Sequence, residues 1–255
     1  MPIASSRIAL QLWTLRHHLQ STGDIARSFA RVRELGFEQV ELGGLPALEP
    51  GELRRLAEAA GLRILASHED PAELLAEPAK VADRLAALGC RLAVFARPHQ
   101  PLTTIDDVLA LADALSRAGE QLRSRGRLLT YLNRAHDFRK VGGKAILDLL
   151  YEHADPFLVH AELDTYFVQL GGGDPAAYCA RLSGRLPLLH VKDFGVGEDE
   201  RPVAAPLGDG NLNFPVILRE AEAAACENYV IEQDVAPGDD AFAAIAKSLR
   251  HLTSL

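Results

Sequence analysis

Short apolar runs alternate along this chain with longer segments in which apolar residues recur at helical spacing. Ile25, Phe29 and Val32, for example, recur at intervals of four and three residues, which is typical of one buried helix face. Short apolar runs bounded by turn residues are typical of buried strands. The pattern predicts eight strands, over Ile8–Leu12, Gln39–Leu42, Arg63–Ser67, Arg91–Phe95, Arg127–Leu132, Phe157–Leu163, Leu186–Val191 and Tyr229–Gln233.

A predicted helix follows each strand. Asp24 is a plausible N-cap of the first helix, and Pro175 occupies the first position of the sixth. Several helices end on a glycine just before the next apolar run, as at Gly36, Gly61 and Gly89. The predicted helices are Asp24–Leu35, Pro50–Ala60, Val81–Leu88, Ile105–Arg123, Lys144–His153, Pro175–Leu182, Phe214–Ala225 and Phe242–Leu252.

Eight strand–helix units of this kind predict an α/β fold, a closed (β/α)₈ TIM barrel. An open doubly wound sheet is the alternative, but the turn after the first strand lacks the GxGxxG pattern of a dinucleotide-binding fold. No boundary divides the chain, so residues 1–255 are expected to form a single TIM-barrel domain. The one long irregular stretch, Phe194–Asn213, is interpreted as a lid over the end of the seventh strand.

Composition narrows the function classes. With a formal net charge of −8, the chain lacks the excess of basic residues that is typical of a nucleic-acid-binding protein, so no nucleic-acid partner is expected. The three cysteines lie far apart and form no CxxC pair, which fits a reducing cytoplasm. We find neither a signal peptide nor an apolar stretch long enough for a membrane span, so no membrane partner is expected. The sequence leaves self-association into a homo-oligomer open.

Acidic or histidine-bearing segments lie at the ends of the last four apolar runs. The strand C-termini of a (β/α)₈ barrel converge on one site, so these side chains are expected to meet there. Asp164, His190 and Glu232 are the metal-ligand candidates, because carboxylates and an imidazole with open positions suit Mg²⁺, Mn²⁺ or Zn²⁺. A structural cap for Asp164 and a buried core histidine for His190 are the alternatives. Lys192 shares the strand parity of His190 and could also point inward.

Three further residues are expected at the same end of the barrel as substrate contacts. Trp13 could stack on a sugar face or simply cover the barrel mouth. His68 could bind a substrate hydroxyl or make a loop hydrogen bond, and Glu41 could bind a hydroxyl from the second strand.

Several short stretches jointly resemble the sugar phosphate isomerase/epimerase family, the xylose-isomerase-like TIM barrels. The resemblance implies a divalent metal held at the strand C-termini and isomerisation, epimerisation or dehydration of sugars, keto-sugars or cyclitols. Asp164, His190 and Glu232 match positions where the family supplies ligands. The matching stretches run in order from near residue 8 to residue 234 and are Ala9–Arg16, Gly36–Leu42, Glu162–Val168, Gly172–Pro175, Gly184–Asp193, Gly208–Phe214 and Ile231–Asp234.

The fifth strand departs from the family pattern. Leu132 and Arg134 occupy two slots that are histidines in many relatives, and Asp137 occupies a glutamate slot. Leucine cannot bind a metal and arginine stays protonated. In one account three protein ligands still hold a metal, with water, Asp137 or His136 completing the shell. In the other, the Arg134 guanidinium lies among the carboxylates and replaces the charge of the metal.

The leading hypothesis is therefore a metal-dependent isomerase, epimerase or dehydratase with a small sugar-like substrate. Glu232 would remove the α-proton, and His190 or Lys192 would stabilise the developing charge. Arg134 would join the substrate contacts. The alternative is a metal-free, catalytically degenerate carbohydrate-binding barrel of the same family. A phosphodiester nuclease of a related branch would need more ligands and a basic face.

Overall fold

The computed structural model describes residues 2–98, 100–235 and 240–255. Eight parallel strands close into a barrel in the order β1-β12-β9-β8-β5-β4-β3-β2. The predicted TIM-barrel fold is therefore confirmed. The barrel strands are β1 (Ile8–Gln11), β2 (Gln39–Leu42), β3 (Arg63–His68), β4 (Leu92–Phe95), β5 (Leu128–Leu132), β8 (Val159–Asp164), β9 (Leu188–Val191) and β12 (Asn228–Ile231).

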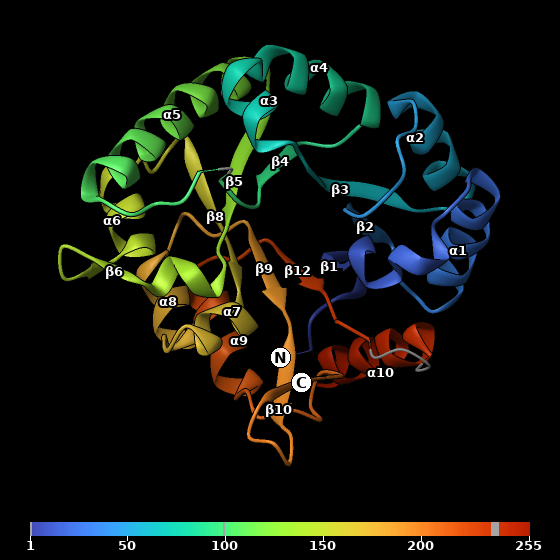
Figure 1. The fold of residues 1–255 in the computed structure, drawn as a ribbon. Coiled ribbons are helices and arrows are strands. Elements are labelled where there is room, and N and C mark those ends of the chain that lie inside the picture. The colour runs from blue at the N-terminus through green and yellow to red at the C-terminus, as the bar shows by residue number, and fades with distance from the viewer. Residues whose placement is uncertain (1, 99, 236–239) are drawn as a thin grey trace.

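The α-helices form a ring outside the strands (Figure 1). Their apolar faces and the outward-facing strand residues make up the larger of two hydrophobic clusters. The helices are α1 (Thr22–Glu34), α2 (Pro50–Ala59), α3 (Pro71–Ala76), α4 (Pro78–Leu88), α5 (Ile105–Ser124), α6 (Ile146–His153), α7 (Thr165–Leu170), α8 (Pro175–Arg181), α9 (Phe214–Ala223) and α10 (Ala241–Ser254). Short 3₁₀ helices cover Ser5–Arg7, Leu12–His18 and Ala135–Phe138.

Four local expectations need correction. Ser21, and not Asp24, caps α1: its hydroxyl accepts the Asp24 backbone N–H, because the helix begins earlier than the apolar pattern does. The fifth predicted helix begins at Ile146, since Lys144–Ala145 form β7, which pairs with β6 (Lys140–Val141). The sixth strand begins at Val159, with Phe157 largely exposed before it.

The fourth correction concerns the stretch Phe194–Asn213, which was expected to be an irregular lid. Much of it is an antiparallel hairpin of β10 (Asp193–Val196) and β11 (Pro202–Ala205). Asp193 organises the loop beyond the hairpin, because its buried carboxylate accepts the backbone N–H groups of Gly208, Gly210 and Leu212. The segment is therefore an ordered substructure beside the strand ends.

Alternate residues on each strand face the barrel interior. The smaller hydrophobic cluster fills it with small and branched side chains, Ala9, Ala66, Leu92, Val94, Leu132, Leu188 and Val230. Along β8 the inward positions are His160, Glu162 and Asp164, from the amino end of the strand to its carboxyl end. A hydrogen bond confirms that Glu162 points inward, because its Oε2 accepts a 2.7 Å hydrogen bond from the buried Thr130 hydroxyl of β5. Polar inward positions thus concentrate toward the carboxyl end.

None of the helices that the structure describes is long and apolar enough to cross a membrane.

Candidate functional site

His190, at the third position of β9, lies at the centre of a buried cluster of carboxylates. Its Nδ1 lies 3.0 Å from Glu232 Oε2, and its Nε2 lies 3.1 Å from Glu41 Oε1. The same Nε2 is 2.8 Å from Glu162 Oε1. His190, Glu41 and Glu162 are completely buried, so these charges interact with little screening by water. Three other strands, β2, β8 and β12, thus bring carboxylates to the one imidazole on β9.

Lys192 forms the second cationic centre of the site. Its ammonium lies 2.9 Å from Glu232 Oε1 and 2.8 Å from Asp234 Oδ2. The same nitrogen lies about 5 Å from the ring centroids of Tyr166 (5.3 Å) and Phe167 (5.2 Å) on α7. Because Asp234 is half exposed while Lys192 is buried, this pair lies where the site opens toward solvent. Glu232 is held between two cations.

Glu41 and His68 form a connected pair on β2 and β3. Glu41 Oε1 accepts hydrogen bonds from the Gln11 amide (2.5 Å), His68 Nε2 (2.6 Å) and His190. Gly43 leaves room for the Gln11 side chain, since a Cβ there would lie 2.6 Å from the Gln11 amide oxygen. His68 therefore makes a protein hydrogen bond, while its side chain keeps some exposure to solvent.

Asp164 is both a helix cap and a candidate ligand. Its Oδ1 accepts the Phe167 backbone N–H at 3.0 Å and so caps α7. Its Oδ2 is buried and accepts no hydrogen bond from any residue that the structure describes. Glu41 Oε2 is in the same situation, whereas Glu162 Oε1 has the His190 ring nitrogen 2.8 Å away. A buried carboxylate oxygen without a donor is costly, so two such atoms at one end of a barrel call for a cation or a ligand donor.

Burial and neighbouring charges shift the pKa values of these groups in opposite directions. Burial raises the pKa of Asp164 to about 6 against the pull of Lys192. Burial and the Glu41 charge raise the pKa of Glu162. For Glu41 burial is outweighed by His190 and His68, which lower its pKa to about 2. Burial is likewise outweighed at His190, whose pKa is held well above its ordinary value by the carboxylates around it.

Burial and neighbouring charges also oppose each other at Glu232 and Lys192. Burial opposes the charged form of Glu232, yet His190 and Lys192 lower its pKa. Burial also opposes the charge of Lys192, but Glu232, Asp164 and Asp234 raise its pKa. Glu232 is therefore ionised and Lys192 protonated at neutral pH. The site thus holds two carboxylates whose pKa is lowered, Glu41 and Glu232, and two whose pKa is raised, Glu162 and Asp164.

The donor set fits a divalent metal. Potential ligand atoms lie within 4.8 Å of one another in two groups that share His190. One is the group expected from the sequence, Asp164, His190 and Glu232; the other is Glu41, His68, Glu162 and His190. Carboxylate oxygens with imidazole nitrogen suit Mn²⁺, Mg²⁺ or Zn²⁺, and the donor-free oxygens of Asp164 and Glu41 offer free lone pairs.

The remaining sequence candidates lie around this centre. Trp13 follows β1, is 45 % exposed and carries the Arg16 guanidinium 4.9 Å above its ring. Arg134 stacks on Phe167, with its guanidinium carbon 4.8 Å from the ring centroid. Among the described residues no ion pair joins Arg134 to Asp164 or Glu232. The structure does not support the alternative account in which the Arg134 guanidinium lies among these carboxylates in place of a metal, since Lys192 is the side chain that lies beside Glu232.

Asp137 and His136 do not supply the missing ligand of the fifth strand. Asp137 accepts the Arg134 backbone N–H at 2.8 Å and lies 3.2 Å from His136. Its carboxylate therefore stabilises the turn to which it belongs. Leu132 belongs to the apolar barrel interior. Within the described chain, β5 thus provides no side chain to either ligand group.

Glu162 and Gln11 are site residues that the sequence reading missed. Glu162 stands two positions before Asp164, so strand parity alone places both carboxylates on the same inward face. Gln11 stands two positions after Ala9 on β1, so it shares the inward face of that strand. The signal was therefore present in the alternation of the strands, whereas the closeness of Glu41 and Glu162 to His190 depends on the closed barrel.

Comparisons with known proteins agree with this geometry. The family model described as xylose isomerase-like TIM barrel matches residues 29–255. A sugar phosphate isomerase/epimerase structure from Parabacteroides distasonis has a TM-score of 0.85 and 24 % identity, with 99 % of this chain and 95 % of that chain covered. No curated protein matches the chain.

Two more distant solved structures are an epimerase and a probable dehydratase. An L-ribulose 3-epimerase has a TM-score of 0.74 at 17 % identity, covering 97 % of this chain and 93 % of that one. A probable 3-DHS dehydratase from Bacillus anthracis has a TM-score of 0.71 at 16 % identity, covering 97 % and 98 %. At these identities the likeness shows a shared fold.

Proposed function

Because the chain belongs to the xylose isomerase-like TIM barrel family, we propose that it is a divalent-metal-dependent isomerase or epimerase, or a dehydratase, acting on a sugar, keto-sugar or cyclitol. The observation that carries the proposal is the convergence of buried carboxylates on His190 at the strand C-termini. Barrels of this fold place their active sites at that end. The structural neighbours, a sugar phosphate isomerase/epimerase, an L-ribulose 3-epimerase and a probable dehydratase, support the reaction class.

Asp164, Glu232 and His190, the last after losing the proton that its carboxylate neighbours favour, would hold the metal, with Glu41 and Glu162 beside them. When bound, the metal would supply Lewis acidity that polarises a substrate carbonyl. Lys192, kept protonated by its carboxylate neighbours, would stabilise negative charge that develops on a substrate oxygen.

Glu232 is the proposed base. It would accept the proton from the carbon next to the carbonyl, and the electron pair of that C–H bond would form the enolate. His190 and Lys192 keep the carboxylate ionised and fix its orientation. Glu162 lies on the other nitrogen of His190, and its raised pKa suits it to carry a proton nearer neutral pH, which supports a second acid–base group.

Substrate contacts are assigned to residues around this centre. Trp13 would cover one face of the sugar, and Glu41, His68 and Arg134 would bind hydroxyl groups. We further propose that the chain is one domain over residues 1–255 and acts in the cytoplasm on a small molecule. The three cysteines are free and buried, which supports a reducing compartment.

A second candidate function has a specific observation in its favour. Lys192 already lies within 3 Å of Glu232 (2.9 Å) and Asp234 (2.8 Å), and β5 offers Leu132 where relatives have a ligand. A barrel with such an internal cation could bind carbohydrate without a metal and without turnover.

Metal binding separates the two candidates. The protein is purified without chelator, its metal content is measured, and thermal unfolding is followed with and without added Mn²⁺. About one equivalent of metal, or a Tm that rises with Mn²⁺, supports the enzyme; the Asp164→Asn variant should weaken that response. No metal and no change in Tm would favour the metal-free binding barrel.

Turnover gives an independent test of the role of Glu232. In a screen of keto-sugars and cyclitols, Glu232→Gln should lower kcat by about 100-fold or more, because a general base contributes about that much. Circular dichroism should show an unchanged fold. Glu227→Gln, at an exposed position directly before β12, is the matched control and should keep full activity. Full activity in Glu232→Gln would refute the assigned role.

A further inference from the structure

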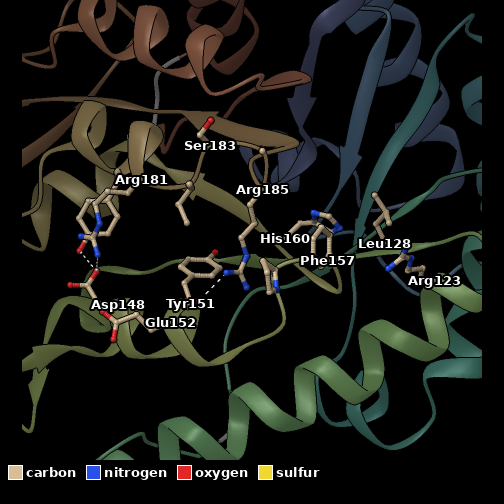
Figure 2. A pocket seen from close by; sticks show the side chains of 14 residues that line it. Arg123, Leu128, Asp148, Tyr151, Glu152, Phe157, His160, Arg181, Ser183 and Arg185 are labelled. Carbon is tan, nitrogen blue, oxygen red and sulfur yellow. Dashed lines mark hydrogen bonds and ion pairs between the residues drawn. The ribbon is translucent and has the colours of Figure 1, made fainter.

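A separate cavity of about 720 Å³ lies at the amino ends of β5, β8 and β9, opposite the carboxylate cluster. Leu128 and His160, the inward residues nearest those strand starts, contribute to its wall, and α6 and α8 contribute from outside (Figure 2). Its volume is within the range of small-molecule sites. The family comparisons and the proposed function assign nothing to this end of the barrel.

The acidic side chains of the cavity are neutralised by partners. Asp148 lies 2.9 Å from the Arg181 guanidinium and accepts a 2.8 Å hydrogen bond from the Tyr178 hydroxyl. Glu152 lies 2.7 Å from the Lys144 ammonium. Neither carboxylate therefore contributes an unbalanced negative charge to the cavity.

The basic side chains at the other side of the cavity are not neutralised in this way. Arg185 is buried and donates all its described hydrogen bonds to backbone carbonyls, those of Val159, Tyr151 and Ala154. Arg123 makes no ion pair with any residue that the structure describes. Carbonyl oxygens satisfy N–H groups without cancelling the charge. The Asp155 carboxylate acts on Arg185 from beyond ion-pair distance, so the uncompensated positive charge at the cavity lies chiefly at Arg123.

His160 adds an unused hydrogen-bonding atom. Its Nε2 is buried and has no hydrogen-bond partner among the described residues. Burial lowers the pKa of His160, and Arg185, Arg91 and Arg123 lower it further, so the imidazole is neutral. Figure 2 shows His160 and Phe157 together between Arg185 and Arg123. A ligand in this position would find a neutral imidazole nitrogen flanked by guanidinium groups.

An apolar surface completes the cavity. Phe157 is 71 % exposed, although it precedes a strand of a closed barrel and could pack inward. The Tyr151 ring is stacked by the Arg185 guanidinium, 4.8 Å from its centroid, and so presents a rigid wall. An exposed phenyl ring beside unpaired cations suits a flat apolar ligand with an acidic group.

We propose that this cavity is a binding site for a small aromatic carboxylate. Arg123 binds the carboxylate, Phe157 contacts the ring, and His160 Nε2 exchanges a hydrogen bond with the ligand. A carboxylate is favoured over a more highly charged anion because Arg123 is the one guanidinium at the cavity with all its N–H groups unassigned among the described residues.

Calorimetric titration of the full chain with naphthoate tests the site. Wild-type protein should bind it, and naphthalenemethanol, which has the ring without the charge, should bind at least tenfold more weakly. Arg123→Gln and Phe157→Ala should each weaken naphthoate binding about tenfold or more. Arg125→Gln and Leu170→Ala remove an arginine and an exposed apolar side chain outside the cavity and should leave the affinity unchanged.

Three outcomes would overturn the proposal: no binding by the wild-type protein at millimolar naphthoate, equal binding of the neutral alcohol, or affinity unchanged in both cavity variants. Binding at the opposite end is distinguished by Glu232→Gln, which should retain wild-type affinity for naphthoate. A perturbed His160 ring resonance in the NMR spectrum of the complex gives a second, independent readout of occupancy.

Discussion

The two ends of the barrel treat charge in opposite ways. At the carboxyl end, buried carboxylates surround His190 and Lys192, and each cation contacts two or more acids within about 3 Å. At the amino end, Arg123 and Arg185 lack a carboxylate partner among the described residues, while Asp148 and Glu152 are paired elsewhere. At one end the cations lie among an excess of carboxylates, and at the other an arginine without an acidic partner lies next to an open cavity.

This difference matters because β8 connects both ends. His160 lies near the amino end of β8, and Glu162 and Asp164 lie toward its carboxyl end. Buried ion pairs tie the carboxyl end to the folding free energy, since removing one partner leaves a buried charge unpaired. The amino-end cavity has little such coupling, so its residues are free to serve a ligand. Substitutions at the two ends should therefore differ most in how much they change the free energy of unfolding.

The largest effect is expected from His190→Ala. It removes the shared partner of Glu41, Glu162 and Glu232 and should lower the free energy of unfolding by about 3–5 kcal/mol, as loss of one member of a buried ion pair does. Urea unfolding in the presence of EDTA measures it. If the alanine variant does not fold, His190→Gln, which keeps a hydrogen-bonding group, should fold with an intermediate loss.

An exposed ion pair provides the control for that measurement. Lys144→Ala breaks the pair with Glu152, whose two side chains are more than half exposed, and should cost less than about 1 kcal/mol. A His190→Ala loss no larger than this control would contradict the view that the carboxyl end is coupled to folding.

A smaller effect of opposite sign is expected from Asp164→Asn. The folded-state pKa of about 6 exceeds the ordinary 3.8, so the folded protein holds the proton more tightly and this group costs stability as pH rises from about 4 to about 6. Asparagine removes that cost and still caps α7. In EDTA at pH 7.5 we expect a gain of at most roughly 3 kcal/mol, because a pKa difference of about two corresponds to that energy.

The pH profile tests the cause of that gain. The difference between Asp164→Asn and wild type should shrink as pH falls through about 6 and approach zero below about pH 3, where wild-type Asp164 is protonated in both the folded and the unfolded state. A difference independent of pH would show that removal of the carboxylate charge is not the reason. Mn²⁺ should reverse the ranking if Asp164 is a metal ligand, since only the wild type would gain from binding.

Much of the fold followed from the sequence because apolar periodicity is a local signal. All eight barrel strands overlap their predicted ranges, and the glycine at Gly89 ends α4 in a left-handed conformation, as expected. The order of the segment after β9 could not be predicted, because the Asp193 carboxylate holds backbone N–H groups of a loop 15 and 17 positions further along the chain. Ser21 was missed as a cap because the apolar pattern of α1 starts later than the helix.

The site was predicted in part for the same physical reason. Asp164, His190 and Glu232 come together because strand ends converge in a barrel. The pairing of Lys192 with Glu232, and of Glu41 with His190 across 149 sequence positions, depends on side-chain directions that no local pattern specifies. The position of Arg134 over Phe167 was missed because a cation next to an aromatic ring needs no acidic partner to be favourable.

The smallest effect on stability is expected at the amino end, from Arg123→Gln. The side chain has no ion-pair partner in the described structure, and its charge lies near Arg185 and His160, so its removal breaks no favourable pair. The free energy of unfolding should change by less than about 0.5 kcal/mol, as for most surface substitutions. The same variant should lose naphthoate affinity. A residue that matters for binding and not for folding has the signature of a ligand site, whereas a loss of several kcal/mol would mean that Arg123 stabilises the barrel and that both ends are coupled to folding.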